Sequence, residues 1–336
     1  MKWDYGDEVT DFNYSTSGLF IVCEGNFQYG NATLSFYDPA SCLIQNEVFF
    51  RANGMKLGDV AQSMTIYDDK GWIVVNNSHV IFAIDTDTFV EKGRIENLTS
   101  PRYIHFISSD KAYVTQIWDN RIYIVNPLTY SISGFILIPD MDISTGSTEQ
   151  MVQCGKYVFC NCWSYQNRII KIDSETDEVV SSISIGIQPN SLVKDKYNRL
   201  WTLTDGGYEG SVYGYETPAL YCIDSESLEI LKIFNFEFGD EVSELQINNE
   251  GTILYWINKD IWGMEIDAEM LPEKPIIEYQ GTKFYGLTVS PEKSEIYVAD
   301  AIDYSQQGMI YRYSSEGELI DKFYTGVAPG NFCWKK

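Results

Sequence analysis

Short runs of β-branched and aromatic residues recur along the chain, and turn-forming residues separate them. The stretch KAYVTQIWDNRIYIVNPLT, residues 111–129, holds two such runs around a short polar break. Runs bounded by Asn, Asp, Gly and Pro are typical of antiparallel strands joined by tight turns. Helical periodicity is nearly absent, so the pattern predicts an all-β protein.

A unit of four such strands repeats along the whole chain. The turn after the third strand begins with a small polar residue in every unit: Asp38, Asp85, Asn126, Asp173, Asp224, Asp267 and Ser314. The mean interval is about 46 residues, which accommodates seven units in the chain. Such side chains bond the backbone two residues on, so we interpret these acids as turn-formers and not as a catalytic set.

Four antiparallel strands repeated every 40 to 50 residues or so are typical of a β-propeller blade. We therefore predict one propeller domain over residues 1–336, with seven four-stranded blades at about 18–50 plus 329–336, 61–96, 102–138, 149–186, 190–236, 242–279 and 283–326. The first unit lacks an obvious first strand, and an apolar segment remains at the C-terminus. We expect residues 331–336 to form the innermost strand of the first blade, which would close the ring and remove the sheet edges.

Charge limits the classes of partner. The chain has 24 Lys and Arg residues against 48 Asp and Glu residues, a formal net charge of −24. Such a surface repels nucleic-acid phosphates and anionic lipids, so neither is an expected partner. No apolar run is long enough to span a membrane. The acidic start lacks a signal-peptide core, which leaves open a cytosolic protein or a mature exported domain whose signal was removed.

Cysteine and histidine do not form a metal-binding pattern. The close pair Cys160 and Cys162 lacks the two-residue gap of zinc and redox motifs, and we interpret the cysteines as core residues. The two histidines, His79 and His105, fit structural roles better than catalysis, although His105 lies in an inner strand and can face the channel. The inner strands offer only a few axial oxygens for Ca²⁺, at Glu244, Asn190 and Gln153. A Ca²⁺ site in an acidic loop is a further alternative.

Aromatic residues gather in the loops between second and third strands. In a propeller these loops share one face with the loops that lead into the next blade, and that face commonly binds ligands. Fold maintenance does not require aromatic residues in turns. The candidate ligand-binding residues are Phe27, Tyr29, Trp118, Asn120, Trp163, Tyr165, Gln166, Arg168, Tyr208, Tyr213, Tyr215, Tyr285, Tyr304 and Gln306. By contrast, Trp72, Trp201 and Trp256 lie inside second strands and are expected between blades.

Trp118 and Trp163 stand at strand ends, in what we take as equivalent positions of adjacent blades. Two interpretations are open: each covers the rim of a neighbouring blade, or both line a concave platform for a flat or bulky ligand. An exposed aromatic cluster with amides around it suits a large ring with polar edges. Neighbouring residues that could bond such edges include Asn161 and Asn167.

The stretch 111–129 and the segment EIYVAD, residues 295–300, resemble the YVTN-type repeat of surface-layer and YncE-like seven-bladed propellers. This acidic, aromatic-rich chain is similar to surface-exposed propellers of gut Bacteroidetes. One branch of these, the BtuG-type lipoproteins, captures vitamin B12 and related corrinoids and passes them to an outer-membrane transporter.

The resemblance implies a non-enzymatic, monomeric corrinoid-binding protein without a cofactor. It also implies a lipid anchor at the outer membrane or a periplasmic location, with the signal segment absent from this chain. An outer-membrane transporter would be its partner.

The sequence motifs give little support to an enzymatic function. The sequence has no GxSxG elbow, HExxH or CxxC zinc motif, or P-loop. Two alternatives stay open: a protein-interaction scaffold in the cell envelope, and a Ca²⁺-dependent lactonase or lyase of the kind built on propellers.

Overall fold

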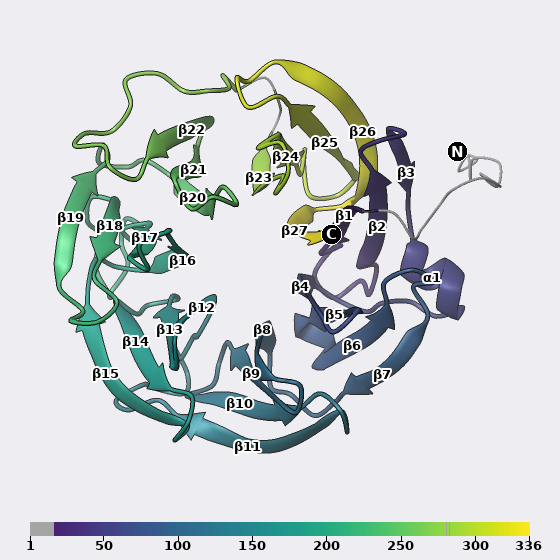
Figure 1. Ribbon diagram of the computed structural model, residues 1–336, viewed down its shortest axis with the longest axis horizontal. Coiled ribbons are helices and arrows are strands. Elements are labelled where there is room, and N and C mark those ends of the chain that lie inside the picture. The colour runs from purple at the N-terminus through teal and green to yellow at the C-terminus, as the bar shows by residue number, and fades with distance from the viewer. Residues whose placement is uncertain (1–16, 280, 282) are drawn as a thin grey trace.

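The computed structural model describes residues 17–279, 281 and 283–336. Its strands form seven antiparallel sheets arranged in a ring about a central axis (Figure 1). This arrangement confirms the predicted seven-bladed β-propeller. Residues 1–16, which we included in the single predicted domain, lie outside the described part of the chain.

The blades are numbered along the chain, and the strands of each are given from the axis outward. Blade 1 contains β27 (Pro329–Lys335), β1 (Gly18–Cys23), β2 (Thr33–Asp38) and β3 (Leu43–Gln45), with helix α1 (Val48–Asn53) after it. Blade 2 contains β4 (Ala61–Tyr67), β5 (Lys70–Val75), β6 (Val80–Asp85) and β7 (Glu91–Ile95), with the 3-10 turn η1 (Asn76–Ser78) after β5. Blade 3 contains β8 (Pro101–Ser108), β9 (Lys111–Gln116), β10 (Arg121–Asn126) and β11 (Ser131–Leu137).

The remaining blades follow the same order. Blade 4 contains β12 (Met151–Cys154), β13 (Tyr157–Cys162), β14 (Arg168–Asp173) and β15 (Glu178–Ser184). Blade 5 contains β16 (Pro189–Lys194), β17 (Leu200–Thr204), β18 (Ala219–Ile223) and β19 (Ile230–Asn235). Blade 6 contains β20 (Val242–Ile247), β21 (Ile253–Asn258) and β22 (Asp260–Glu265), and blade 7 contains β23 (Phe284–Val289), β24 (Ile296–Asp300), β25 (Gln307–Tyr313) and β26 (Leu319–Val327).

The C-terminal strand closes the ring. β27 pairs antiparallel with β1, so that Leu19 lies opposite Trp334 and Ile21 opposite Phe332. Figure 1 shows the C-terminus among the inner strands, beside β1 and next to blade 7. The predicted closure is confirmed, and the strand begins two residues earlier than expected, at Pro329.

Blade 6 differs from the predicted four-stranded unit. Among the described residues it has three strands, and the expected fourth strand meets β22 only at an isolated bridge between Ile261 and Ile277. The segment before that bridge contains Pro272 and Pro275. Proline has no amide hydrogen to donate to a ladder, so a continuous outer strand is disfavoured here.

Tryptophan residues of the second strands fill the space between blades, as predicted. Trp72, Trp201 and Trp256 are each at most 1% exposed. Trp72 packs in one cluster with Ile104 and Val114 of the next blade, and Trp201 shares a cluster with Trp256. Burial of large apolar side chains on both faces of each sheet therefore holds the blades together.

The recurring acids act as turn-formers, as predicted. Asp85 Oδ1 accepts a hydrogen bond from the backbone N–H of Thr88, which lowers the pKa of Asp85 to about 2. Asn126 and Asp224 accept equivalent backbone bonds, and so do Asp38, Asp173 and Ser314. Asp267 differs, because its Oδ1 lies 3.4 Å from an Arg199 guanidinium nitrogen instead.

Candidate functional site

Two sets of loops share one face of the propeller, which we call the loop face. They are the loops between second and third strands and the loops that lead into the innermost strand of the next blade. The second strands end and the innermost strands begin at this face, because neighbouring strands are antiparallel. All fourteen sequence-predicted binding residues lie in these loops or at the strand ends that adjoin them.

Many of the predicted aromatic residues are exposed there. Those with exposed fractions between 49% and 77% are Phe27, Tyr29, Trp118, Tyr208 and Tyr213. Tyr215 and Tyr304 are also exposed, whereas Trp163, Tyr165 and Tyr285 are half-buried. Large apolar rings left in contact with water on one face indicate a surface that meets a ligand or partner.

The aromatic residues form separate groups around the face. Tyr165 of blade 4 packs on Tyr213 of blade 5, with ring centroids 4.5 Å apart. Tyr285 and Tyr304 of blade 7 meet edge to face at 5.1 Å. Tyr215 packs at a tilt against Phe238, with ring centroids 4.6 Å apart, and the sequence analysis missed Phe238. The structure therefore does not gather all the predicted residues into one platform.

Trp118 is held in a strained position that presents its ring to solvent. Its backbone φ is 60°, the left-handed region, which costs a residue with a Cβ about 1–2 kcal/mol. The backbone on either side compensates, because Trp118 N–H donates to the Gly146 carbonyl over 2.7 Å and the next residue, Asp119, is fully buried. Asp119 in turn accepts two bonds of 2.8 Å from Arg121. This clamp supports the interpretation of Trp118 as part of a binding surface.

Trp163 has a different environment. Its Nε1 donates to Asp205 Oδ2 of blade 5 over 3.1 Å, and burial raises the pKa of that carboxyl group. Gln188 also donates to Asp205, over 2.9 Å. Trp163 thus covers the rim of the neighbouring blade, the alternative that the sequence had left open.

The predicted equivalence of Trp118 and Trp163 is wrong. The carbonyl of Asn120 accepts a bond from Ile138, and the carbonyl of Asn167 accepts the matching bond from Ile185, each 2.8 Å long. Counting back from these positions aligns Trp118 with Tyr165, which also has a left-handed φ, of 63°. The loop of blade 4 has one residue more than that of blade 3, and Trp163 is the first residue of its loop whereas Trp118 is the second.

The predicted polar residues fall into two classes. Arg168 donates to the Pro139 carbonyl over 2.9 Å, and Gln306 donates to Asp303 over 3.1 Å. The side-chain amides of Asn120 and Gln166 form no hydrogen bond with any residue in the described ranges. These two amides are therefore available to a ligand.

Bulges at the start of the innermost strands mark the central opening on this face. The pairing of β8 with β9 jumps from Pro101–Gln116 to Ile104–Val114, and similar shifts occur in five other blades, at Gln62, Asn190, Glu244, Tyr285 and Gly330. In blade 4, Glu149 N–H donates to the carbonyl of Asn161, whose own N–H donates to Gln150. Bulges re-aim side chains and are common beside functional sites.

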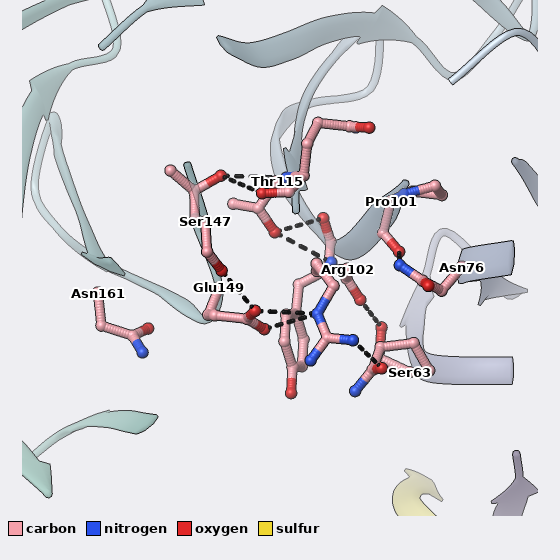
Figure 2. Close-up of polar contacts among 12 residues, drawn as sticks. Ser63, Asn76, Pro101, Arg102, Thr115, Ser147, Glu149 and Asn161 are labelled. Atoms are coloured by element: carbon pink, nitrogen blue, oxygen red, sulfur yellow. Dashed lines mark hydrogen bonds and ion pairs between the residues drawn. The ribbon is translucent and has the colours of Figure 1, made fainter. Parts of the chain in front are cut away.

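A buried ion pair lies at this opening (Figure 2). Arg102 Nε is 2.9 Å from both carboxylate oxygens of Glu149, and the two side chains are 16% and 4% exposed. Ser147 Oγ donates to Glu149 over 2.9 Å, and Arg102 also donates to Gln62. Figure 2 shows Arg102 between Glu149 of blade 4 and Ser63 of blade 2, so one guanidinium connects three blades.

Two further carboxyl groups stand close by. Tyr285 donates its hydroxyl to Glu24 Oε1 over 2.9 Å, and burial raises the pKa of Glu24. Burial, together with the charge of Glu24, raises the pKa of Glu244 to about 8. We call Glu24, Arg102, Glu149, Glu244 and Tyr285 the channel mouth.

The sequence analysis named only two of these five residues. Tyr285 was a predicted ligand contact and Glu244 an axial oxygen, whereas Glu24, Arg102 and Glu149 were missed. A usable signal for Arg102 was its place directly after Pro101, the proline that opens an inner strand, as Pro189 does before Asn190. No such signal marks Glu24 or Glu149.

Below the mouth, His105 faces the channel as expected and pairs with Gln153 over 3.0 Å, while burial lowers the pKa of its imidazole. Across residues 17–279, 281 and 283–336, no three His, Cys, Asp or Glu side chains are grouped so that they could hold a metal ion. In the same ranges, none of the helices has the length and apolar character that crossing a membrane requires.

Several solved structures share the fold. A quinonprotein alcohol dehydrogenase-like protein from Bacteroides thetaiotaomicron superposes with a TM-score of 0.70 at 15% identity, covering 96% of this chain and 79% of that one. The periplasmic gluconolactonase of Pseudomonas aeruginosa gives 0.69 at 11% identity, over 95% and 99% of the two chains. A protein from Lactobacillus plantarum gives 0.69 at 9% identity, over 96% and 100%. At these identities the likeness shows the fold alone.

Comparison of sequences gives the family. No curated protein matches the chain. Residues 17–326 match the family described as a domain of unknown function, DUF5074. Since the match spans nearly all the blades, the chain belongs to the DUF5074 family.

Proposed function

We propose that this protein captures a bulky ligand on its loop face without covalent chemistry, and that the ligand is cobalamin or a related corrinoid. The observation that carries the proposal is the exposed Trp118 ring with the unpaired amide of Asn120 two residues away. A corrinoid has apolar faces and a fringe of amide groups. Rings would cover its faces, and side-chain amides would bond its edge.

The adjacent blade supplies a second set of the same kind. Tyr165, the structural counterpart of Trp118, stacks on Tyr213, and the unpaired amide of Gln166 follows it. An aromatic ring beside a free amide thus recurs on neighbouring blades. Rigid aromatic side chains provide contact area at low entropic cost, which favours binding over simple surface exposure.

Location and partner belong to the same proposal. The resemblance to BtuG-type lipoproteins supports a lipid-anchored protein at the cell surface or in the periplasm, delivering its ligand to an outer-membrane transporter. The lopsided charge of −24 is compatible with an extracytoplasmic, soluble domain. Since binding alone serves this role, we propose that the protein is not an enzyme.

Calorimetric titration with cyanocobalamin tests the proposal. We expect binding at micromolar concentrations, and Trp118→Ala to weaken it about tenfold, the loss of one aromatic contact. Tyr197→Ala is the matched control, because Tyr197 is 56% exposed in the loop between β16 and β17 on the opposite face. Absence of both heat and co-elution, or equal weakening by the two variants, would reject corrinoid capture at this face.

A scaffold for another protein is the second candidate. The observation that favours it is the spread of aromatic residues in separate groups, from Tyr285 and Tyr304 to Tyr215 and Phe238. Such spacing suits a partner that covers much of the face. Affinity capture from an envelope fraction would then recover one stoichiometric partner, lost in a Tyr215→Ala/Phe238→Ala variant, while cyanocobalamin gives no heat.

A further inference from the structure

The channel mouth opens into a cavity of about 490 Å³ along the axis. Residues of all seven innermost strands line the cavity, and its wall includes Ile104, Leu192, Leu287 and Phe332. Glu244 lies in the same wall. A cavity of this size, in which apolar side chains and several polar groups converge, is large enough for a small molecule.

The channel mouth contains three carboxyl groups and one guanidinium group. Glu149 is satisfied by Arg102 and Ser147, so the single guanidinium is already paired. Glu24 receives one bond, from the neutral hydroxyl of Tyr285. Glu244 forms no hydrogen bond or ion pair with any residue that the structure describes. Glu244 lines the cavity next to Glu24, and neither carboxyl group has an ion-pair partner among the described residues, although the charge of Arg102 acts on Glu24. Ionising both groups costs free energy unless a further cation is supplied.

A buried acceptor near Glu149 is also unsatisfied. Asn161 is fully buried, and its Nδ2 donates to the Pro189 carbonyl over 2.6 Å. Its Oδ1 has no hydrogen-bond partner in the described chain, although almost every buried polar atom of a native protein has one. Figure 2 shows the Asn161 amide pointing toward the side of Glu149. Within the described chain, Asn161 Oδ1 thus lacks a hydrogen-bond donor.

We propose that the channel mouth is a second binding site, which takes the protonated amine of a small organic ligand between Glu24 and Glu244. An ammonium group brings both missing elements, one positive charge and three N–H donors. The apolar wall below the mouth takes the hydrocarbon part of the ligand. The phenol rings of Tyr103 and Tyr285, which line or adjoin the opening, add a favourable environment for a cation.

The position of the two acids argues for a recognition role. Glu24 follows the second strand of blade 1, and Glu244 sits at a bulge of blade 6 with a left-handed φ of 57°. A Cβ at Gly330 would come within 2.5 Å of Glu24 Oε1, so the absence of a side chain there gives Glu24 its room. Glu24 accepts a hydrogen bond from Tyr285 of blade 7, but neither carboxyl group joins blades through an ion pair in the described chain. This inference is independent of corrinoid capture on the aromatic loops.

Calorimetry with hexylammonium chloride tests the proposal on the full chain. We expect saturable one-to-one binding that Glu244→Gln and Glu24→Gln each weaken at least tenfold and that the double variant abolishes. Glu292→Gln, which alters an exposed acid on the opposite face, is the matched control and should bind like the wild type. Trp118→Ala should also leave hexylammonium binding unchanged, which separates this site from the corrinoid site.

Other probes give outcomes that overturn the proposal. The guanidinium Nη2 of Arg102 has no partner among the described residues, so an anionic ligand is the main rival. Binding of sodium hexanoate in place of hexylammonium would favour that rival. Binding of Ca²⁺ without hexylammonium would indicate a metal site. Equal affinity of the wild type and the double variant for hexylammonium, with all variants folded by circular dichroism, would also reject the amine site.

Discussion

The channel mouth and the aromatic loops lie on the same face but are stabilised in different ways. At the mouth, Arg102 and Glu149 are largely buried and bonded across three blades. In the loops, Trp118 is 49% exposed and its ring makes none of the ring contacts found among the described residues. Charged side chains at the channel mouth therefore contribute to the stability of the fold, whereas we expect substitution of Trp118 to change stability little.

Loss of ring closure should have the largest effect on stability, because both the channel mouth and the aromatic loops depend on the closed ring. Deleting residues 329–336 removes β27 and exposes the edge of β1, and it removes Gly330 and Asn331 from the axis. We expect loss of a cooperative melting transition in circular dichroism. Deleting Lys336 alone, which follows the strand, is the control and should leave the transition intact. An unchanged transition after the longer deletion would contradict closure by β27.

The buried ion pair gives the next largest effect. Arg102→Met leaves the Glu149 carboxylate buried without its cation, and we expect a loss of about 3 kcal/mol in the free energy of unfolding. Lys92→Met is the matched control, because its pair with Asp85 is exposed and should contribute less than about 0.5 kcal/mol. Urea titration measures both. Adding Glu149→Gln to Arg102→Met should recover part of the lost stability. Similar small losses in all variants would contradict a special contribution of the channel mouth to stability.

Glu244→Gln should change stability by a smaller amount, which depends on pH. Since its folded pKa, about 8, is above the ordinary value of 4.5, the folded state holds a proton that the unfolded chain releases. The wild type therefore loses stability as pH rises from 4.5 to 8, whereas Glu244→Gln does not. We expect equal stability at pH 4.5 and an advantage of about 2 kcal/mol for the variant at pH 9, less than the full linkage because water in the channel screens the charge.

The control for this profile is Glu292→Gln, whose carboxyl is exposed. Urea unfolding across the pH range should give parallel curves for this variant and the wild type. A Glu244→Gln curve that also stays parallel to the wild type would show that Glu244 titrates normally, and that the mouth is well solvated.

Within the loops, Trp118 and Trp163 should contribute differently to stability. Trp163→Phe removes the bond to the partly buried Asp205, so we expect a loss of about 1 kcal/mol. Trp118→Ala removes a half-exposed ring and should change stability by no more than about 0.5 kcal/mol. Thermal melting compares them directly. A larger loss for Trp118→Ala than for Trp163→Phe would mean that the Trp118 ring contributes to packing and that the Trp163 bond to Asp205 does not stabilise the fold.

The strands and their number could be predicted because the relevant information is local. Alternating apolar runs and turn-forming residues such as Asp85 and Asn126 specify each hairpin within a few residues. The inter-blade positions of Trp72 and Trp201 followed from the same strand periodicity. The missing outer strand of blade 6 was not foreseen, because its apolar residues fit a strand although its two prolines do not.

The candidate site was only partly predictable. Loop composition identified the exposed Trp118, but the pattern could not show that Trp163 bonds Asp205, which lies 42 positions further along the chain. The two tryptophans also differ in their place in the loop, because Trp163 is the first residue of a longer loop and Trp118 the second residue of a shorter one. Side-chain roles in loops therefore depended on contacts with a different blade.

By itself the sequence determined an all-β chain of seven repeated units closed by its own C-terminal strand, since hydrophobic periodicity and turn chemistry act over short distances. Only the tertiary structure decided which polar residues meet at the axis. Glu24, Arg102, Glu149 and Glu244 come from four blades and are separated by up to 220 positions in the chain. Bulges turn Arg102 and Glu244 toward one opening, and burial there raises the pKa of Glu24 and Glu244, a property that arises only when the ring is assembled.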